Sequence, residues 1–183
     1  MCGRYSVLAA DGLQATEVYP TDHAPVILRQ GCEAASFECL HWGFKKWDGQ
    51  GVIINARSET LQTTRMFSGL LATRRCVVPA CEYYEWKKIG REKVKYFITD
   101  REGQCFFMAG LYRDGEAGRE FVIITKDAFG EVAGIHARMP VILREEQMEQ
   151  WLNGKLSSDD LVKMDLDMTA QPCENENMQM SLF

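Results

Sequence analysis

The sequence predicts an α+β fold: one domain built on a mostly antiparallel, barrel-like β-sheet with a few short helices. Stretches rich in Val, Ile, Phe and Tyr recur along the chain, bounded by Gly, Asp and Pro, as is typical of strands. The turn-forming segments KKIGREK and TDREGQ join consecutive stretches of this kind, which favours hairpins. The length of 183 residues suits a single domain with a substantial core.

Eight stretches are expected to form strands. In chain order they are residues 3–8, 25–29, 36–42, 52–55, 75–79, 94–99, 105–112 and 121–125. The stretch CEYYEWKK is left open: as a strand it would place Tyr83 and Glu85 on one face and Glu82, Tyr84 and Trp86 on the other.

Helices are expected to be few and short. In TTRMFSGLLATRR, Thr63 or Thr64 is a candidate N-cap. REEQMEQWLNG spaces Met148 and Trp151 on one helical face and ends at a glycine. SSDDLVKM begins with serine followed by acidic residues, a helix-start signal.

The last part of the chain, TAQPCENENMQMSLF, turns polar. Residues 1–168 are therefore expected to form the domain and residues 169–183 a flexible tail.

Composition excludes several classes of protein. Hydrophobic residues make up 46% and charged residues 26%, an ordinary globular balance, and no apolar run approaches the length of a membrane span. The N-terminus has no secretory signal, so the cytoplasm is the expected compartment. The seven cysteines include no C-x-x-C pair, which argues against structural zinc and favours buried, reduced thiols. We expect no cofactor, no membrane partner and a monomer.

The formal net charge of −5 is unevenly distributed. Residues 1–114 hold 15 Lys and Arg against 13 Asp and Glu, whereas residues 115–183 hold 6 against 13. A protein that coats duplex DNA would be far more basic. A local groove that touches a few phosphates is compatible with this balance, as is an ordinary solvated surface.

The chain begins MCGRYS, which places a cysteine directly after the initiator methionine. Removal of Met1 would give Cys2 a free amine with a pKa of about 7.7–8.0 beside a thiol with a pKa of about 8.5. Such an aminothiol can attack an acyl group with the amine as base, or close a thiazolidine ring on an aldehyde. A buried cysteine with no chemical role is the simpler alternative.

Three polar residues in apolar surroundings are candidates to act with Cys2. Asn55 ends the run GVIIN, although it is also a common turn former. Glu85 lies among aromatics, where its pKa would be raised, unless it faces solvent beside the following lysines. His136 in GIHARMPVIL has the most structured context of the three histidines, although a lone histidine is more often structural.

The segment LHWGFKKWDGQG combines tryptophans, lysines and glycines, a combination able to stack a base and hold phosphate. Trp47 is expected to be exposed in this loop. For Trp42, a place in the core is the stronger interpretation.

Together, MCGRYS, WGF, INARSET, TTRMF, EYYEW and GIHARMPVIL resemble the SRAP (SOS response-associated peptidase) family in residues and in order, from Met1 to about Leu152. The resemblance implies the SRAP fold and a protein that senses abasic sites in single-stranded DNA. It implies a covalent thiazolidine crosslink through Cys2, which shields the lesion during the DNA damage (SOS) response. Autoproteolytic N-terminal processing, a peptidase-type hydrolase activity and a lyase activity belong to the same implication.

The resemblance also assigns roles to individual residues. Cys2 would be the nucleophile, with Asn55, Glu85 and His136 completing the catalytic site. The implied DNA contacts are Arg4, Pro25, Trp42, Trp47, Arg57 and Arg138. An N-terminal-nucleophile cysteine peptidase or amidohydrolase, and a noncovalent reader of modified DNA, are the alternatives.

Two segments depart from the family pattern or add to it. VYPTDHAPVIL keeps Ala24 and Pro25 but lacks the Arg and Asn of the usual Arg-Tyr-Asn-x-Ala-Pro stretch, which puts DNA contacts from this loop in doubt. The terminal QMSLF, with Gln179, Leu182 and Phe183, resembles the pentapeptide that binds the bacterial sliding clamp. Packing of Leu182 and Phe183 on their own domain is the alternative.

Overall fold

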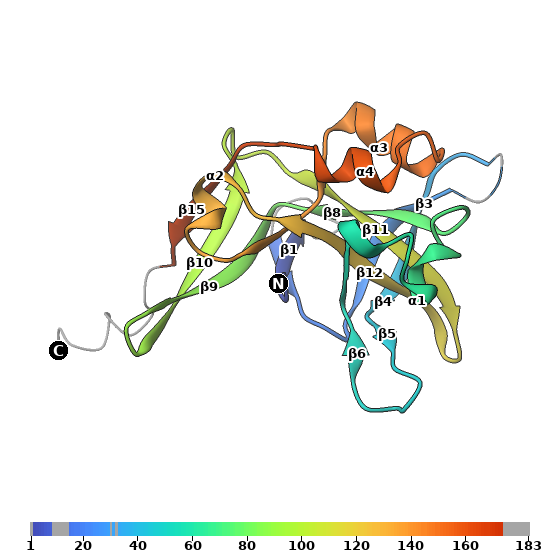
Figure 1. The fold of residues 1–183 in the computed structure, drawn as a ribbon, viewed down its shortest axis with the longest axis horizontal. Helices are drawn as coiled ribbons and strands as arrows, with labels where there is room; N and C mark the ends of the chain where they lie inside the picture. The colour runs from blue at the N-terminus through green and yellow to red at the C-terminus, as the bar shows by residue number, and fades with distance from the viewer. Residues whose placement is uncertain (1, 9–14, 30, 32, 174–183) are drawn as a thin grey trace.

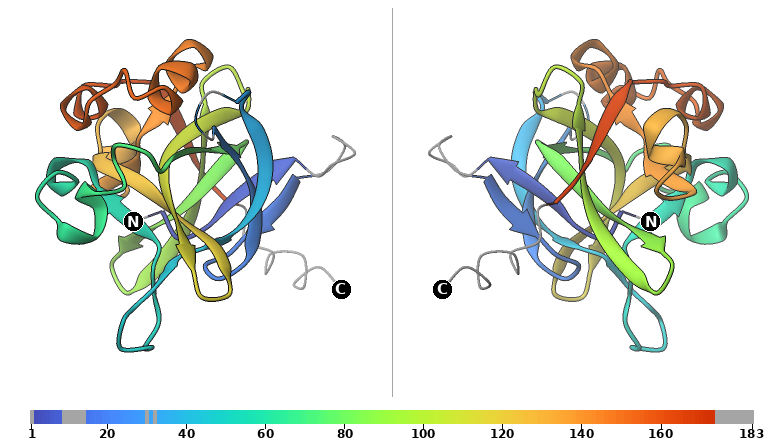
Figure 2. Two further views of the ribbon diagram at one scale, coloured as in Figure 1. Left: turned by 90° about the vertical axis from the view of Figure 1, so that its right-hand side faces the viewer. Right: turned by 90° about the vertical axis from the view of Figure 1, so that its left-hand side faces the viewer.

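Five strands close into a barrel at the centre of the molecule (Figures 1 and 2). We describe a computed structural model, in which residues 2–8, 15–29, 31 and 33–173 are described. The barrel strands are β3 (His23–Leu28), β4 (Ser36–Trp42), β8 (Arg75–Ala80), β11 (Phe106–Gly115) and β12 (Gly118–Asp127). Antiparallel pairing runs from β4 through β3, β8 and β11 to β12, and a parallel contact between β12 and β4 closes the ring.

Strand β12 explains why the barrel has two separate cores. Its side chains alternate between the two sides, and both sides are buried. Phe121 and Ile123 pack in the core that also contains Trp42 and Cys2. Val122 and Ile124 pack in a second core, which α3 (Glu145–Leu152) and α4 (Ser158–Val162) cover through Trp151 and Leu161. A strand buried on both faces reads as a continuous apolar run, as EFVIITK does.

A second, open sheet packs against the barrel. Its buried side chains extend the core that contains Trp42 and Cys2. Its order is β15 (Met168–Pro172), β10 (Glu92–Asp100), β9 (Glu82–Ile89), β1 (Tyr5–Leu8) and β2 (Ala15–Val18). All of its pairs are antiparallel. The β9–β10 hairpin turns at Gly90, whose φ of +61° lies in the left-handed region that glycine adopts readily, and the hairpin projects from the body (Figure 1).

Shorter elements connect these layers. Strands β5 (Phe44–Lys45) and β6 (Val52–Ile53) form a second projecting hairpin, followed by β7 (Asn55–Arg57) and the 3₁₀ turn η1 (Ser58–Thr60). The remaining elements are α1 (Arg65–Ser68), α2 (Gly130–Ala133), β13 (Arg138–Pro140) and β14 (Ile142–Leu143). Ser157 caps α4 and exchanges hydrogen bonds with Asp160, as the sequence signal predicts.

The predicted fold class is confirmed, and every predicted strand has a counterpart. The expected helix over residues 63–75 is shorter than predicted, because only Arg65–Ser68 is helical. The expected start of a flexible tail at residue 169 is wrong. Residues 169–172 belong to β15, which pairs with β10 and buries Met168 in the core. Residues 174–183, including the clamp-like pentapeptide, lie outside the described residues.

The expectation that all cysteines are reduced is also wrong, since Cys81 and Cys105 form a disulfide. It joins the β8–β9 corner to the start of β11, two positions that lie 24 residues apart in sequence but side by side in space. Within the described part of the chain, no group of His, Cys, Asp or Glu side chains is arranged to hold a metal ion. None of the described helices is long and apolar enough to span a membrane.

Candidate active site around Cys2

Cys2 is completely buried where the open sheet meets the barrel. The side-chain amide of Asn55 donates a hydrogen bond to the Cys2 carbonyl oxygen over 2.9 Å. The Cys2 thiol lies 3.8 Å from the carbonyl oxygen of Arg4 and donates to it. The N-terminal segment is thus held at both its backbone and its side chain.

Trp42 sets the spacing between the two segments that meet at Cys2. Its indole N–H donates to the carbonyl oxygen of Ile54 over 3.1 Å, immediately before Asn55. Its ring contacts Tyr5 edge-on, with centroids 5.1 Å apart, and stacks with Phe121 on the other side. Trp42 has no exposed surface, so it packs in the core that contains Cys2 and offers no ring to a bound strand.

The side-chain oxygen of Asn55 is available for a second interaction, besides the hydrogen bond that its nitrogen makes. Its backbone is fixed because β7 runs parallel to β12, with Asn55 opposite Ile123. Its Oδ1 is buried and has no hydrogen-bond partner among the described residues. Because a buried amide oxygen is rarely left unpaired, this atom is positioned to accept a hydrogen bond from a substrate hydroxyl or an amine.

Glu85 is the buried carboxylate of the site and is 4% exposed. It lies on the same face of β9 as Tyr83, as the alternation of the strand predicts. Burial raises the pKa of Glu85 above its usual value, and the neighbouring His136 opposes that rise. A carboxyl with a raised pKa is suited to exchange protons near neutral pH.

His136 lies at the rim of the site, with 31% of its side chain exposed. Its Nδ1 is 3.8 Å from Oε1 of Glu85 and lies within hydrogen-bond distance of both the backbone nitrogen (3.0 Å) and the carbonyl oxygen (3.1 Å) of Arg138. In a neutral ring with Nδ1 as acceptor, Nε2 carries the proton. In that tautomer the ring can give a proton to an atom outside the protein.

The thiol itself is neutral at rest. Burial raises the pKa of Cys2 far above its usual value, and the nearby Glu85 raises it further. A thiolate is the nucleophilic form, so the thiol must lose its proton as it attacks. The site therefore needs a base close to Sγ, and Glu85 is the nearby carboxylate.

Two tyrosines at the site have no catalytic role in the sequence-based assignment. The hydroxyls of Tyr5 and Tyr83 are buried and have no hydrogen-bond partner among the described residues. Burial raises the pKa of both, so both stay protonated and can donate. The sequence signal was the shared face of Tyr83 and Glu85, which could only be used once CEYYEWKK was known to be a strand.

The arginines predicted to contact DNA have different surroundings. The Arg4 guanidinium lies between the rings of Tyr19 and Trp86, at 4.4 and 5.1 Å, and 3.4 Å from the Glu17 carboxylate. Arg57 is exposed, two residues beyond Asn55. These two groups keep donors available to a phosphate.

Arg138 is committed to the protein. It makes a bidentate pair with Glu59 at 2.7 and 2.8 Å, a second pair with Asp127, and a hydrogen bond to the carbonyl oxygen of Thr125 at 2.8 Å. Only 13% of its side chain is exposed. It joins η1, which follows Asn55, to the strand that follows His136. Its geometry is that of a structural clamp.

Trp47 and Pro25 lie outside the immediate surroundings of Cys2. Trp47 is 95% exposed between the strands of the β5–β6 hairpin, as predicted. Pro25 is half-buried in β3 and lines a shallow hollow with Leu8, Glu17 and His23. Their roles as DNA contacts stay predictions.

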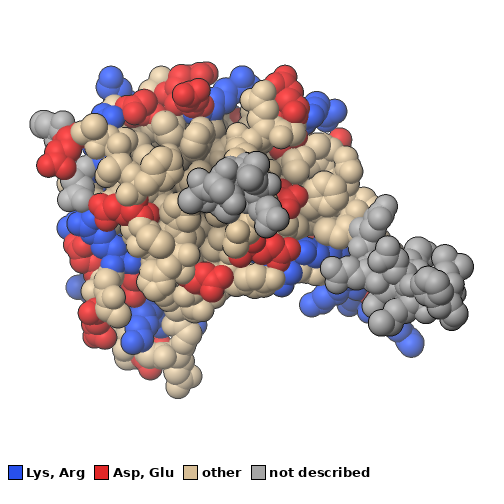
Figure 3. Space-filling model, turned by 180° about the vertical axis from the view of Figure 1, so that it is seen from behind, with Lys and Arg blue, Asp and Glu red and all other residues tan. Residues whose placement is uncertain are grey.

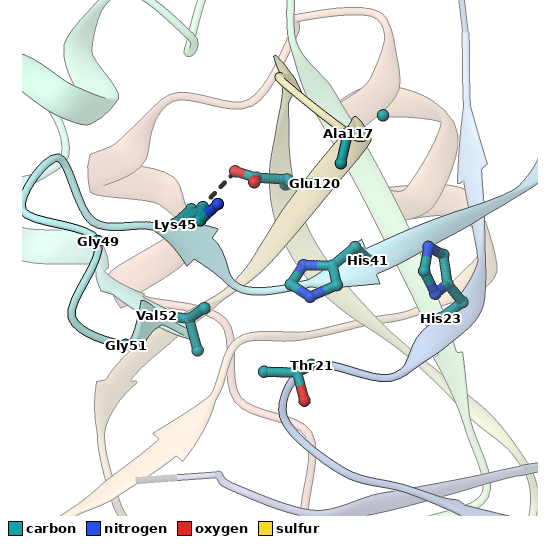
Figure 4. A pocket seen from close by; sticks show the side chains of 10 residues that line it. Thr21, His23, His41, Lys45, Gly49, Gly51, Val52, Ala117 and Glu120 are labelled. Carbon is teal, nitrogen blue, oxygen red and sulfur yellow. Dashed lines mark hydrogen bonds between the residues drawn. The ribbon is translucent and has the colours of Figure 1, made fainter.

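A separate cavity of about 340 Å³ lies beside the β5–β6 hairpin (Figure 4). The side chains of His23, His41 and Thr21 face it, and Glu120 accepts the backbone N–H of Lys45 at its wall. The four candidate catalytic residues are not among those that line it. The chemistry therefore centres on Cys2 and not on this cavity.

Fold and site together define a class: a small β-barrel protein whose second residue is a buried cysteine beside an amide, a carboxylate and an imidazole. The family model of "SOS response associated peptidase (SRAP)" matches residues 1–181. The chain belongs to the SRAP family.

Similar proteins carry a common name. The chain is 30% identical to the abasic site processing protein YedK of Escherichia coli (strain K12), over 86% of this chain and 82% of YedK. It is 32% identical to the abasic site processing protein YMR114C of Saccharomyces cerevisiae, over 80% of this chain but only 43% of that protein. A crystal structure of a Bacteroides thetaiotaomicron protein covers 98% of this chain with a TM-score of 0.78 and 26% identity.

Proposed function

We propose that this protein forms a covalent thiazolidine crosslink between Cys2 and an abasic site in single-stranded DNA, and thereby protects the lesion during the response to DNA damage. The observation that carries the proposal is the hydrogen bond from Asn55 to the Cys2 carbonyl, made beside Glu85 and His136. An incidental buried cysteine would not need a carboxylate and an imidazole next to it. The relatives' common name, abasic site processing protein, supports the same substrate.

The first step is opening of the abasic sugar. The sugar is mostly a closed hemiacetal, and only its open form carries an aldehyde. We assign His136 to this step, since its Nε2–H can give a proton to the ring oxygen as the bond from that oxygen to C1′ breaks. The C1′ hydroxyl loses its proton to a base, for which Glu85 is the candidate.

The second step joins protein and DNA through nitrogen. After removal of Met1, the free amine of Cys2 adds to the aldehyde carbon, and loss of one water gives an imine. Glu85 returns the proton that the departing hydroxyl needs. Asn55 holds the Cys2 backbone and offers Oδ1 to orient the amine.

The third step closes the ring. The thiol adds to the imine carbon and its proton passes to the nitrogen, with Glu85 as the carrier. The product contains one C–N and one C–S bond and has lost one water relative to the reactants. Low exposure of the thiol keeps it protonated until a substrate arrives.

Incubation with abasic single-stranded DNA tests the proposal. The mature protein is expected to give a heat-stable, slower-migrating band, and the Cys2→Ala protein none. An oligonucleotide with a reduced abasic site, which has no aldehyde, is the matched control for the DNA. Absence of the band from protein shown to lack Met1 would contradict the proposal.

Peptidase chemistry is the second candidate, favoured by the family's description and by the same aminothiol. In this alternative the thiol attacks an amide and the amine acts as base. Turnover of peptide or amide substrates without DNA would support it. A noncovalent DNA reader would instead keep its full affinity after loss of the Cys2 thiol.

The terminal QMSLF extends the proposal to a protein partner. Its leucine and phenylalanine suit the apolar pocket of a replicative sliding clamp. A pull-down with clamp protein should capture the full chain and lose the chain that lacks residues 179–183. Equal capture of the two proteins would end this idea.

A further inference from the structure

The β9–β10 hairpin carries a concentration of positive charge that the rest of the molecule lacks. Between residues 87 and 95 stand Lys87, Lys88, Arg91, Lys93 and Lys95, with Glu92 as the only acidic residue, although the chain as a whole has a net charge of −5. Figure 3 shows Lys and Arg side chains gathered over this projection. Lys88, Arg91 and Lys93 are exposed.

Two of the three lysines on the outer face of the hairpin have no ion-pair partner within the described part of the chain, whereas the third, Lys95, pairs with Glu17 over 3.0 Å. We call Tyr84, Trp86, Lys88, Lys93 and Lys95 the basic hairpin face, because alternation and register place them on one side of the two strands. Lys88 lies directly opposite Lys93, and like charges in such a cross-strand pair destabilise a sheet. Neither lysine has an ion-pair partner within the described part of the chain.

Aromatic rings alternate with these cations. Lys95 lies over the Tyr84 ring at 4.0 Å, and Trp86, opposite Lys95, lies beside the Arg4 guanidinium at 5.1 Å. Cations interleaved with stacking rings are typical of surfaces that bind single-stranded nucleic acid. The face is thus continuous from Arg4, two residues from Cys2, to the tip of the hairpin.

The same hairpin carries the catalytic carboxylate. Glu85 and Lys87 share the opposite face of β9, so the Glu85 face and the basic hairpin face are the two sides of one hairpin and meet at its tip beyond Lys88. From Tyr84 to Lys88 the strand advances about 14 Å, which is room for about four phosphates at the 3.4 Å spacing of a stacked strand.

We propose that the basic hairpin face binds the sugar–phosphate backbone of the DNA flank next to the abasic site, as an extension of the Cys2 site. This inference rests on the proposed function, because it takes its ligand to be the strand that Cys2 attacks. The repulsion between Lys88 and Lys93 is relieved when phosphates lie between them. The two lysines therefore lower the stability of the free protein but raise its affinity for DNA.

The test compares two doubly substituted proteins, both in a Cys2→Ser background so that covalent capture does not mask affinity. Lys88→Gln with Lys93→Gln alters the face, and Lys155→Gln with Lys163→Gln removes the same charge from exposed positions at the ends of α3 and α4. Fluorescence anisotropy measures the affinity for an abasic oligonucleotide at several salt concentrations.

The hairpin pair of substitutions is expected to weaken binding and to reduce the slope of log K against log salt by about 1.4, since each lost contact to a single strand contributes about 0.7. The control pair is expected to leave the slope unchanged. Shortening the DNA on one side of the lesion, but not on the other, should abolish the difference between the proteins.

Thermal unfolding gives a second measurement, in which the hairpin substitutions are expected to stabilise the protein or leave its stability unchanged, although they weaken binding. Removal of the Lys88–Lys93 repulsion should keep or raise the midpoint of unfolding, which separates lost binding from lost folding. Equal slopes for the hairpin and control pairs would overturn the inference. If wild-type protein fails to crosslink abasic DNA, the proposed function fails instead, and that experiment does not depend on the hairpin.

Discussion

In the described part of the chain, buried polar side chains are hydrogen-bonded on barrel strand β12, whereas two of those in the open sheet are not. In the barrel, Lys126 pairs with Asp165 and donates to the carbonyl of Met164, and Thr125 donates to the carbonyl of Ala56. In the open sheet, the hydroxyls of Tyr5 and Tyr83 have no hydrogen-bond partner among the described residues. Unpaired buried groups cost free energy, so natural proteins keep them mainly where a function uses them. The unpaired hydroxyls of the open sheet therefore mark its side of the Cys2 site, to which the segments packed on the barrel add Asn55 and His136.

Of the substitutions considered, Glu85→Gln should have the largest effect, and this effect is on the rate of crosslinking. Loss of the proton carrier is expected to slow crosslinking about 10²–10⁴-fold. The wild-type rate should rise with pH as Glu85 loses its proton, at a higher pH than for an ordinary glutamate, because burial raises its pKa. The variant should lack this limb. A crosslinking rate measured across pH checks both statements, with Glu82→Gln, on the other face of β9, as control.

The same variant should not lose stability. The folded-state pKa of Glu85 lies above the unfolded value, so the folded protein binds more protons in this window and stability falls as pH rises through it. Glutamine removes that loss. Near pH 4 and below, variant and wild type should differ little, and above it the variant should be the more stable. A lower unfolding midpoint at neutral pH would contradict the buried-charge account.

Trp42→Ala tests the barrel side. Removal of this buried ring, together with its contacts to Tyr5 and Phe121, should lower the free energy of unfolding by about 3–5 kcal/mol. Trp47→Ala is the matched control, since Trp47 is 95% exposed and its loss should stay within about 0.5 kcal/mol. Chemical denaturation measures both. Similar losses would show that Trp42 does not join the two sheets.

The disulfide tests the connection between the two regions. Cys81→Ser with Cys105→Ser opens a loop closed over 24 residues, which should cost about 3 kcal/mol. A reducing agent should destabilise the wild type by a similar amount and leave the variant unaffected. Cys39→Ser, at an exposed free thiol, serves as control. Equal stability of wild type with and without reductant would remove the disulfide from the account.

Substitutions of Arg4 and Arg138 have the smallest expected effects, and the two differ in how they change the salt dependence of DNA binding. Arg4→Gln should weaken DNA binding and reduce the salt slope by about 0.7, as a lost phosphate contact would. Arg138→Gln should leave the salt slope unchanged, but cost about 1 kcal/mol of stability, because its donors bind Glu59 and Asp127. A reduced slope for Arg138→Gln would restore its predicted role as a DNA contact.

The sequence predicted the barrel strands because each carries a strong local signal, such as the apolar run of β12. It missed β2 and β15, which are short, polar edge strands. They are strands only because β1 and β10 pair with them. The candidate residues Cys2, Asn55, Glu85 and His136 were identified from motifs, but their separation of up to 134 positions hides their proximity. The commitment of Arg138 to Glu59 and the Cys81–Cys105 disulfide depend on tertiary contacts that no local pattern encodes.

Intact mass spectrometry of the protein, alone and after reaction with an abasic oligonucleotide, tests the central claim most directly. The account predicts a protein that lacks Met1 and, after reaction, a species heavier by the oligonucleotide minus one water. The Cys2→Ala protein should give no species that survives heating. A wild-type mass that is unchanged after reaction, in a sample shown to lack Met1, would contradict the account.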